Sequence, residues 1–126
     1  MPLISGKAVG SPSIAKGMVN LEERFTVGDT LTQDSTFLLI PGLPNVTFRV
    51  SSSALGAVEV YMQVALRKTG IGKATYGFTT LGPGVLVSSA APLLFEVNLA
   101  AQAIRIRMTN NTGGGVTLQT YLMATA

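Results

Sequence analysis

The chain has 126 residues, enough for one hydrophobic core and too few for two domains of ordinary size. It contains no cysteine and no histidine, which excludes thiol nucleophiles, disulfide bonds, imidazole bases and the commonest zinc ligands. Among its six acidic residues, no pair shows the pattern of a catalytic couple. The sequence therefore predicts a protein that is not an enzyme, with no catalytic residues, no metal ligands and no cofactor.

The balance between apolar and charged residues indicates assembly. Hydrophobic residues make up 47% of the chain and charged residues only 12%, whereas a soluble domain usually carries about 25% charged residues. No window holds the roughly 20 near-continuous apolar residues of a membrane-spanning helix, so contact with other protein subunits explains the low charge better than a membrane does. The net charge of +3 is spread along the chain without a basic run, and we expect no nucleic-acid partner.

The first 20 residues differ from the rest of the chain. They mix glycine, proline, serine and lysine with single apolar residues, and they lack the continuous apolar core of a signal peptide. Two interpretations stay open: a disordered terminus, or an extended arm that lays Ile4, Val9 and Ile14 along a neighbouring subunit. We therefore divide the chain into an N-terminal arm, residues 1–20, and a single domain, residues 21–126.

From Ser35 onward, apolar residues recur at every second position, which is the period of a half-buried strand. The pattern is strong at residues 46–50, 58–67, 104–109 and 116–123, and weaker at 37–40, 74–79, 85–88 and 94–97. Clusters rich in glycine, proline or small polar residues predict turns at 41–44, 51–56, 70–72, 82–84 and 110–115. Seven or eight short strands with frequent turns predict an all-β fold, an antiparallel β-sandwich that is jelly-roll-like.

The segment 93–107 fits two patterns. Its apolar residues also fall at three- and four-residue spacing, which would give a helix one coherent apolar stripe. We prefer strand, turn and strand with the bend at residues 100–102, because Ile106 would leave the stripe of such a helix and β-branched residues suit a pleated sheet.

Arg105 and Arg107 alternate with apolar residues and therefore share one face of a strand, about 7 Å apart. They are either ordinary surface cations or residues that pair with carboxylates of a partner, because the planar guanidinium group makes bidentate contacts. Together with Ile4, Val9 and Ile14, these two arginines are the candidate partner-binding residues.

The final third, FEVNLAAQAIRIRMTNNTGGGVTLQTYLMATA, resembles the closing hairpin of small β-sandwich virion proteins of tailed bacteriophages, the head decoration or cement proteins. The resemblance rests on the alternating strand at 103–109, the glycine-rich turn at 110–115 and the last strand. It implies a homotrimer on the capsid surface that binds the major capsid protein, often with an extended terminal arm, and that has neither cofactor nor catalysis. No binding residue can be transferred from that family to a position of this chain.

We therefore expect a structural virion protein, a capsid decoration or cement protein, made in the host cytoplasm and acting by protein–protein contacts. The alternative is a ligand-binding β-sandwich, such as a carbohydrate-recognising module of a fibre or secreted protein. Carbohydrate sites usually present aromatic platforms with acid or amide groups. The sequence has no tryptophan, and its three tyrosines lie in separate segments.

Overall fold

The computed structural model describes the backbone of residues 3–4, 7–8, 13–15, 17–54, 56–66, 68–69, 75–87 and 91–126, and the side chains of 17–54, 56–66, 76–87 and 91–126. All regular structure in these ranges is β-strand. The strands are β1 (Leu3–Ile4), β2 (Lys7–Ala8), β3 (Ser13–Ala15), β4 (Met18–Val27), β5 (Thr32–Asp34), β6 (Leu38–Leu39), β7 (Asn45–Ser52), β8 (Val58–Ala65), β9 (Lys68–Thr69), β10 (Thr75–Tyr76), β11 (Thr79–Leu86), β12 (Leu93–Asn98), β13 (Ala103–Asn110) and β14 (Val116–Thr125).

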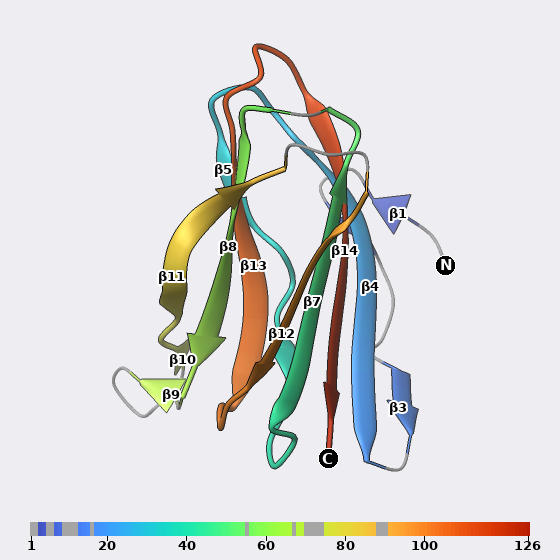
Figure 1. Ribbon diagram of the computed structural model, residues 1–126, viewed down its shortest axis with the longest axis vertical. Coiled ribbons are helices and arrows are strands. Elements are labelled where there is room, and N and C mark those ends of the chain that lie inside the picture. Colours follow the sequence, from blue (N-terminus) through green and yellow to red (C-terminus); the bar gives the residue numbers. More distant parts are fainter. Residues whose placement is uncertain are drawn as a thin grey trace.

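Two antiparallel sheets pack face to face as a sandwich (Figure 1). One sheet has the order β12-β7-β14-β4-β3, and the other has the order β11-β8-β13-β5, with β6 also pairing with β13. Successive strands mostly cross from one sheet to the other, which is the connectivity of a jelly roll. The predicted fold class, an antiparallel and jelly-roll-like β-sandwich, is confirmed.

The period of two builds the core. Along β13, Ile104, Ile106 and Met108 are fully buried between the sheets, while Arg105 and Arg107 lie on the outer face. In the opposite sheet, Leu118 and Leu122 of β14 alternate in the same way with half-buried or exposed residues. One inward face from each sheet therefore supplies a single hydrophobic core.

Strands from the end of the sequence occupy the middle of both sheets. β13 lies between β8 and the pair β5 and β6, and β14 lies between β4 and β7. The turn 111–115 joins the two strands, so one hairpin-like unit contributes the inner strand of each sheet. β14 pairs with β4 along its whole length, from Val116 opposite Val27 to Thr125 opposite Met18.

The structure confirms the preferred interpretation of residues 93–107. β12 and β13 are strands and residues 99–102 connect them, so no helix forms there. The predicted strand at 58–67 ends as β8 at Ala65. The predicted turn at 70–72 lies outside the described residues.

The predicted turn at 82–84 is wrong. These residues lie inside β11, where the pairing with β8 shifts register between Leu81 and Val85, as at a β-bulge. Gly82 has a φ of +67°, a conformation that residues with a Cβ rarely adopt. The Gly-Pro-Gly sequence therefore bends one strand without ending it.

The N-terminal segment contains three short strands. β1 pairs with β2, and β3 pairs with β4 at the edge of its sheet. β4 begins at Met18, inside the range expected for the arm. Val9 and the side chains of Ile4 and Ile14 lie outside the described residues, so their contact with a partner stays a prediction.

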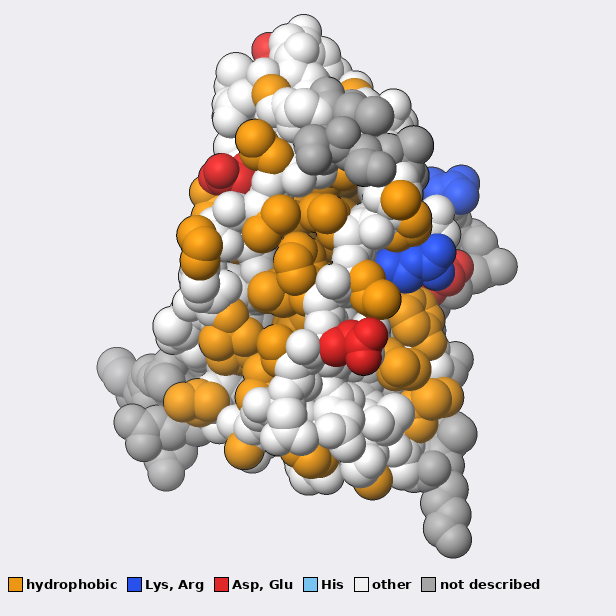
Figure 2. All heavy atoms as spheres, in the orientation of Figure 1, with side chains coloured by type: hydrophobic (Ala, Val, Ile, Leu, Met, Phe, Trp, Pro, Cys, Tyr) orange, Lys and Arg blue, Asp and Glu red, His pale blue; other side chains and the backbone are white. Residues whose placement is uncertain are grey.

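Hydrophobic side chains reach the surface on the side of the sandwich that faces the viewer in Figures 1 and 2. β11 and β12, the terminal strands of their sheets, both lie on this side. The half-buried residues here include Leu81, Val85, Leu93, Phe95 and Val97, and Figure 2 shows the apolar surface that is seen on this side. Within the described part of the chain, no helix is long and apolar enough to cross a membrane.

Candidate functional site

The outer face of the sheet β11-β8-β13-β5 carries the site that the two arginines define. Register places Arg105 opposite Gln63 of β8, and it places Arg107 between Tyr61 of β8 and Asp34 of β5. Cross-strand pairs share one face of a sheet, so these side chains lie together on the solvent side. Along β8 and β13, buried apolar side chains alternate with these polar ones and hold the strands against the core. This packing fixes the positions of the polar groups.

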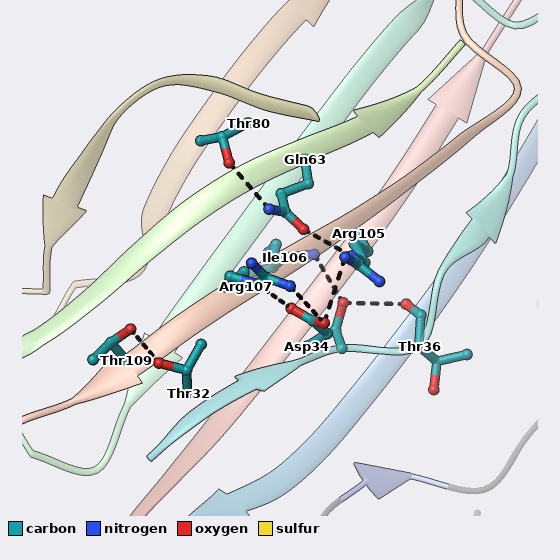
Figure 3. A network of polar contacts seen from close by, with 10 residues as sticks. Thr32, Asp34, Thr36, Gln63, Thr80, Arg105, Ile106, Arg107 and Thr109 are labelled. Atoms are coloured by element: carbon teal, nitrogen blue, oxygen red, sulfur yellow. Dashed lines mark hydrogen bonds and ion pairs between the residues drawn. The ribbon is translucent and has the colours of Figure 1, made fainter. Parts of the chain in front are cut away.

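Both guanidinium groups converge on one carboxylate (Figure 3). Arg107 donates from Nε to Oδ1 of Asp34 at 2.7 Å and from Nη2 to Oδ2 at 3.1 Å, which is a bidentate pair. Arg105 Nη2 lies 3.4 Å from Oδ2 of the same carboxylate. Two positive charges therefore share one negative charge, and this cluster of three keeps a net charge of +1.

A chain of hydrogen bonds extends from Arg105 toward β11. Arg105 Nε donates to Oε1 of Gln63 at 2.8 Å, and Nε2 of Gln63 donates to Oγ1 of Thr80 at 3.0 Å (Figure 3). Gln63 is buried, and both ends of its amide are satisfied. The amide therefore orients the guanidinium group of Arg105 along the sheet.

Aromatic rings lie directly beside these charges. The guanidinium carbon of Arg105 lies 4.0 Å from the centre of the Phe78 ring, within the range of a cation–π contact. The Phe37 ring lies 6.0 Å from that of Phe78 and 5.3 Å from that of Tyr76, with the planes tilted by 48° and 56°. We name the surface formed by Asp34, Phe37, Gln63, Tyr76, Phe78, Arg105 and Arg107 the arginine–aromatic face.

The segment between β5 and β6 holds Phe37 on this face. Ser35 Oγ accepts a hydrogen bond from Ile106 N at 2.9 Å, which ties the segment to β13. Thr36 donates from its backbone N to Oε1 of Glu23 at 2.9 Å, and from its hydroxyl to Oε2. Glu23 is only 2% exposed and reaches Thr36 from β4 in the opposite sheet. A buried carboxylate therefore anchors the segment that displays Phe37.

The two arginines differ in their environment. Burial lowers the pKa of Arg105 below its ordinary value; Asp34 opposes this change and Arg107 adds to it. The hydrogen bond to Asp34 raises the pKa of Arg107, with a smaller opposing effect of burial. The Arg107 side chain is 41% exposed, twice the 20% of Arg105, so Arg107 is the more accessible charge.

The predicted site is thus partly assembled within the chain. Arg105 and Arg107 do share one face, and both bind a carboxylate of the same chain, Asp34; their contact with a partner stays a prediction. The rings and the amide were not identified from the sequence, although Gln63 alternates with apolar residues in its strand. Asp34 lies in a polar stretch of the sequence, and the two arginines that it binds are about 70 residues away. In the described part of the chain, no group of three or more acidic side chains could hold a metal ion.

No model of a known protein family matches the sequence, and no curated protein matches it. Similar solved structures include PliG of Aeromonas hydrophila, a periplasmic inhibitor of g-type lysozyme, at 11% identity over 90% of this chain and 92% of that chain, with a TM-score of 0.46. A carbohydrate-binding module of the β-sandwich superfamily matches at 16% identity over 82% of this chain and 41% of that chain, with a TM-score of 0.40. A chain of infectious bursal disease virus, Gx strain, matches at 8% identity over 92% of this chain and 40% of that chain, with a TM-score of 0.42. These are likenesses of fold, and none of them says what this chain binds.

Proposed function

We propose that this chain is a non-catalytic structural protein of a virion, a decoration or cement protein that binds the major capsid protein on the outside of a phage head. One observation carries the proposal: the arginine–aromatic face gathers two arginines of β13 and three aromatic rings from adjoining segments in one network of contacts. Arginine and aromatic side chains are the residues most enriched at the centres of protein interfaces. The proposal includes self-association of the chain.

The charges of this face favour an acidic partner surface. Asp34 engages Nε and Nη2 of Arg107, and the exposed remainder of that guanidinium group is available to a second carboxylate. Phe37 is 41% exposed, and its ring contacts the ring of Phe78, over which the guanidinium group of Arg105 lies. An acidic side chain of a partner would thus meet a charge and an apolar anchor together.

The test compares arginines of the two sheets in a capsid co-sedimentation assay. We expect the double variant Arg105→Gln/Arg107→Gln, and Arg107→Gln alone, to bind capsids at least about fivefold more weakly, because an arginine at an interface hot spot contributes more than about 1 kcal/mol. The matched control for Arg107→Gln is Arg24→Gln, which removes one exposed charge from the outer face of the other sheet. Equal capsid binding by all of these proteins would refute the role of the arginine–aromatic face.

A second candidate function, carbohydrate recognition, is favoured by the same rings. Arg105 joins the ring of Phe78 to the carboxylate of Asp34, and acids near aromatic rings are typical of sugar-binding sites. The ring planes are steeply tilted to one another, and the guanidinium group of Arg105 lies over the Phe78 ring. The three rings therefore do not form one flat stacking platform, which favours the first proposal. Calorimetric titration with a panel of oligosaccharides, using the wild type and Phe37→Ala, decides between them: saturable binding that Phe37→Ala removes would support the second.

A further inference from the structure

The sheets differ in how their terminal edges are protected. β11 has a bulge and Pro83, which lacks a backbone N–H, while β3, β5 and β6 are only two or three residues long. Such features are common protection against pairing with another chain. β12 has six residues, pairs with β7 in one unbroken register and contains neither proline nor lysine. Among the described strands, β12 is therefore the terminal strand best suited to accept another strand.

The hydrogen-bonding phase of β12 follows from its register with β7. Leu99 N donates to Pro44 O at 2.9 Å and continues the pairing of Asn98 with Asn45. Hydrogen-bonded pairs alternate along an antiparallel ladder, so the odd-numbered residues of β12 direct their backbone groups toward β7. The N–H and C=O groups of Leu94, Glu96 and Asn98 consequently point to the open side of the strand.

The side chains of β12 make this edge apolar. Leu93, Phe95 and Val97 face the core and stay half-buried, and Leu94 on the outer face is 57% exposed. Figure 2 shows hydrophobic side chains gathered on this side of the molecule, with few charges among them. A strand added here would extend the sheet and cover the apolar row, which is the usual gain of β-augmentation.

We propose that β12 pairs antiparallel with β12 of a second copy of this chain, about a two-fold axis that passes beside Phe95. This register places Phe95 opposite Phe95 of the second copy and Leu93 opposite its Val97, so that the inward-facing row of each copy continues into the other. Leu94 lies opposite Glu96 of the second copy, and both of these residues have outward-pointing backbone groups. The backbone phase and the side-chain faces therefore agree, which a shift by one residue would prevent.

Charge selects this register over the neighbouring one whose axis passes beside Glu96, which also keeps the phase. That shift by two residues would place Glu96 opposite Glu96 of the second copy, and like charges directly opposite each other are destabilising. In the proposed register each Glu96 instead lies opposite Leu94, whose partner in β7 is Arg49. Glu96 of one copy and Arg49 of the other then share a row of the extended sheet. The two phenylalanines form a non-hydrogen-bonded pair, in which side chains approach most closely.

This inference rests on the self-association that the proposed function includes. A two-fold axis closes a dimer, whereas the family resemblance implies a trimer, so the two differ in mass. Sedimentation equilibrium of the full chain at micromolar concentration is expected to give twice 13.1 kDa. A monomer over the whole concentration range, or a trimer, would overturn the proposal.

Single cysteines test the register, because the chain has no cysteine of its own. Under mild oxidation, Phe95→Cys should form a disulfide-linked dimer on a non-reducing gel. Val97→Cys alone and Leu93→Cys alone should not, because each lies opposite a different residue of the second copy. A mixture of these two variants should cross-link. The mixture keeps the test valid if Phe95→Cys fails to fold.

The pattern of cross-links has a clear reading. Cross-linking of Glu96→Cys but not of Phe95→Cys or of the mixture would place the axis at the neighbouring register and overturn the proposal. Equal cross-linking of Val97→Cys alone would indicate random collision and would overturn it too. Dimers with the expected pattern that fail to bind capsids would refute the proposed function while the strand pairing stands. Capsid binding by a trimer would refute the strand pairing while the proposed function stands.

Discussion

At the scale of single residues, two buried polar side chains on neighbouring strands differ in their hydrogen bonding. Glu23 and Thr120 are paired in register, and both face the core at 2% and 1% exposure. The carboxylate of Glu23 accepts two hydrogen bonds from Thr36. Within the described residues, the hydroxyl of Thr120 has no hydrogen-bond partner. A buried polar group without a partner costs more free energy than one whose hydrogen bonds are satisfied.

Replacing Glu23 by alanine should destabilise the protein. The change removes both acceptors of Thr36 and leaves a cavity, so the free energy of unfolding in urea should fall by about 2 kcal/mol or more. Glu23→Gln should stay close to the wild type, because an amide can accept from Thr36 N and donate to its hydroxyl. Glu22→Ala is the control, since its exposed side chain should matter by less than about 0.5 kcal/mol. A Glu23→Ala variant as stable as Glu22→Ala would show that the buried carboxylate anchors nothing.

Replacing Thr120 by valine should have the opposite sign. Valine keeps the shape and removes the unpaired hydroxyl, so the free energy of unfolding should rise by about 1 kcal/mol. The control is Thr117→Val on the exposed side of the same strand. A loss of stability in Thr120→Val alone would mean that the hydroxyl has a partner, such as a buried water molecule.

At the scale of elements, the bulge of β11 depends on a close contact with β8. A Cβ added to Gly84 would lie 2.6 Å from Cε2 of Tyr61 and 2.7 Å from the side chain of Glu59. The Tyr61 hydroxyl donates to the Glu59 carboxylate, so these two side chains occupy the space together. A side chain at position 84 can therefore be accommodated only if Tyr61 and Glu59 shift.

Gly84→Ala should therefore displace this pair. We expect the free energy of unfolding to fall by about 1–2 kcal/mol, in the range of other changes that overfill a packed site. Gly114→Ala is the matched control, because nothing lies within 4 Å of a Cβ at that position. Urea denaturation of both variants measures the difference. Equal stability would show that Tyr61 and Glu59 move aside without cost.

The alternation of apolar residues predicts where strands lie better than it predicts which strands pair. The alternation of Ile104, Ile106 and Met108 was sufficient to place β13, and it also placed the two arginines on its outer face. The sequence does not predict β4, because Glu23 interrupts the row of apolar residues between Leu21 and Phe25 and hides the period of two. The pairing of Arg107 with Asp34 joins residues from distant parts of the sequence, and it depends on a sheet order that alternation does not specify.

At the scale of the whole molecule, the core is built from the sandwich strands. The described side chains of β4 to β14 already form one continuous hydrophobic core, and β3 pairs with the edge of β4. We therefore predict that the core tolerates loss of the N-terminal segment. Apolar residues such as Ile4 and Ile14 would then be available to a neighbouring subunit.

Deleting residues 2–16 should leave a folded β-protein by circular dichroism, because β4 and its ladder with β14 are kept. If the arm clamps a neighbour, its contacts must offset an ordering entropy of about 1–2 kcal/mol per residue, and capsid affinity should fall sharply. The full-length chain with serine at Ile4, Val9 and Ile14 is the control for chain length. Unchanged capsid binding by both proteins would return the segment to a dispensable tail.

The late position of β13 and β14 in the sequence affects how the protein is made. On a ribosome, β4 and β7 emerge long before β14, the strand that separates them in the finished sheet, and β8 likewise waits for β13. Until then the nascent chain exposes strand edges whose correct neighbours do not yet exist, and neither sheet can be completed before the hairpin-like unit of β13 and β14 has emerged. Such non-local closure is slow. Production of this protein should therefore be sensitive to chaperone supply and to growth temperature more than its small size suggests.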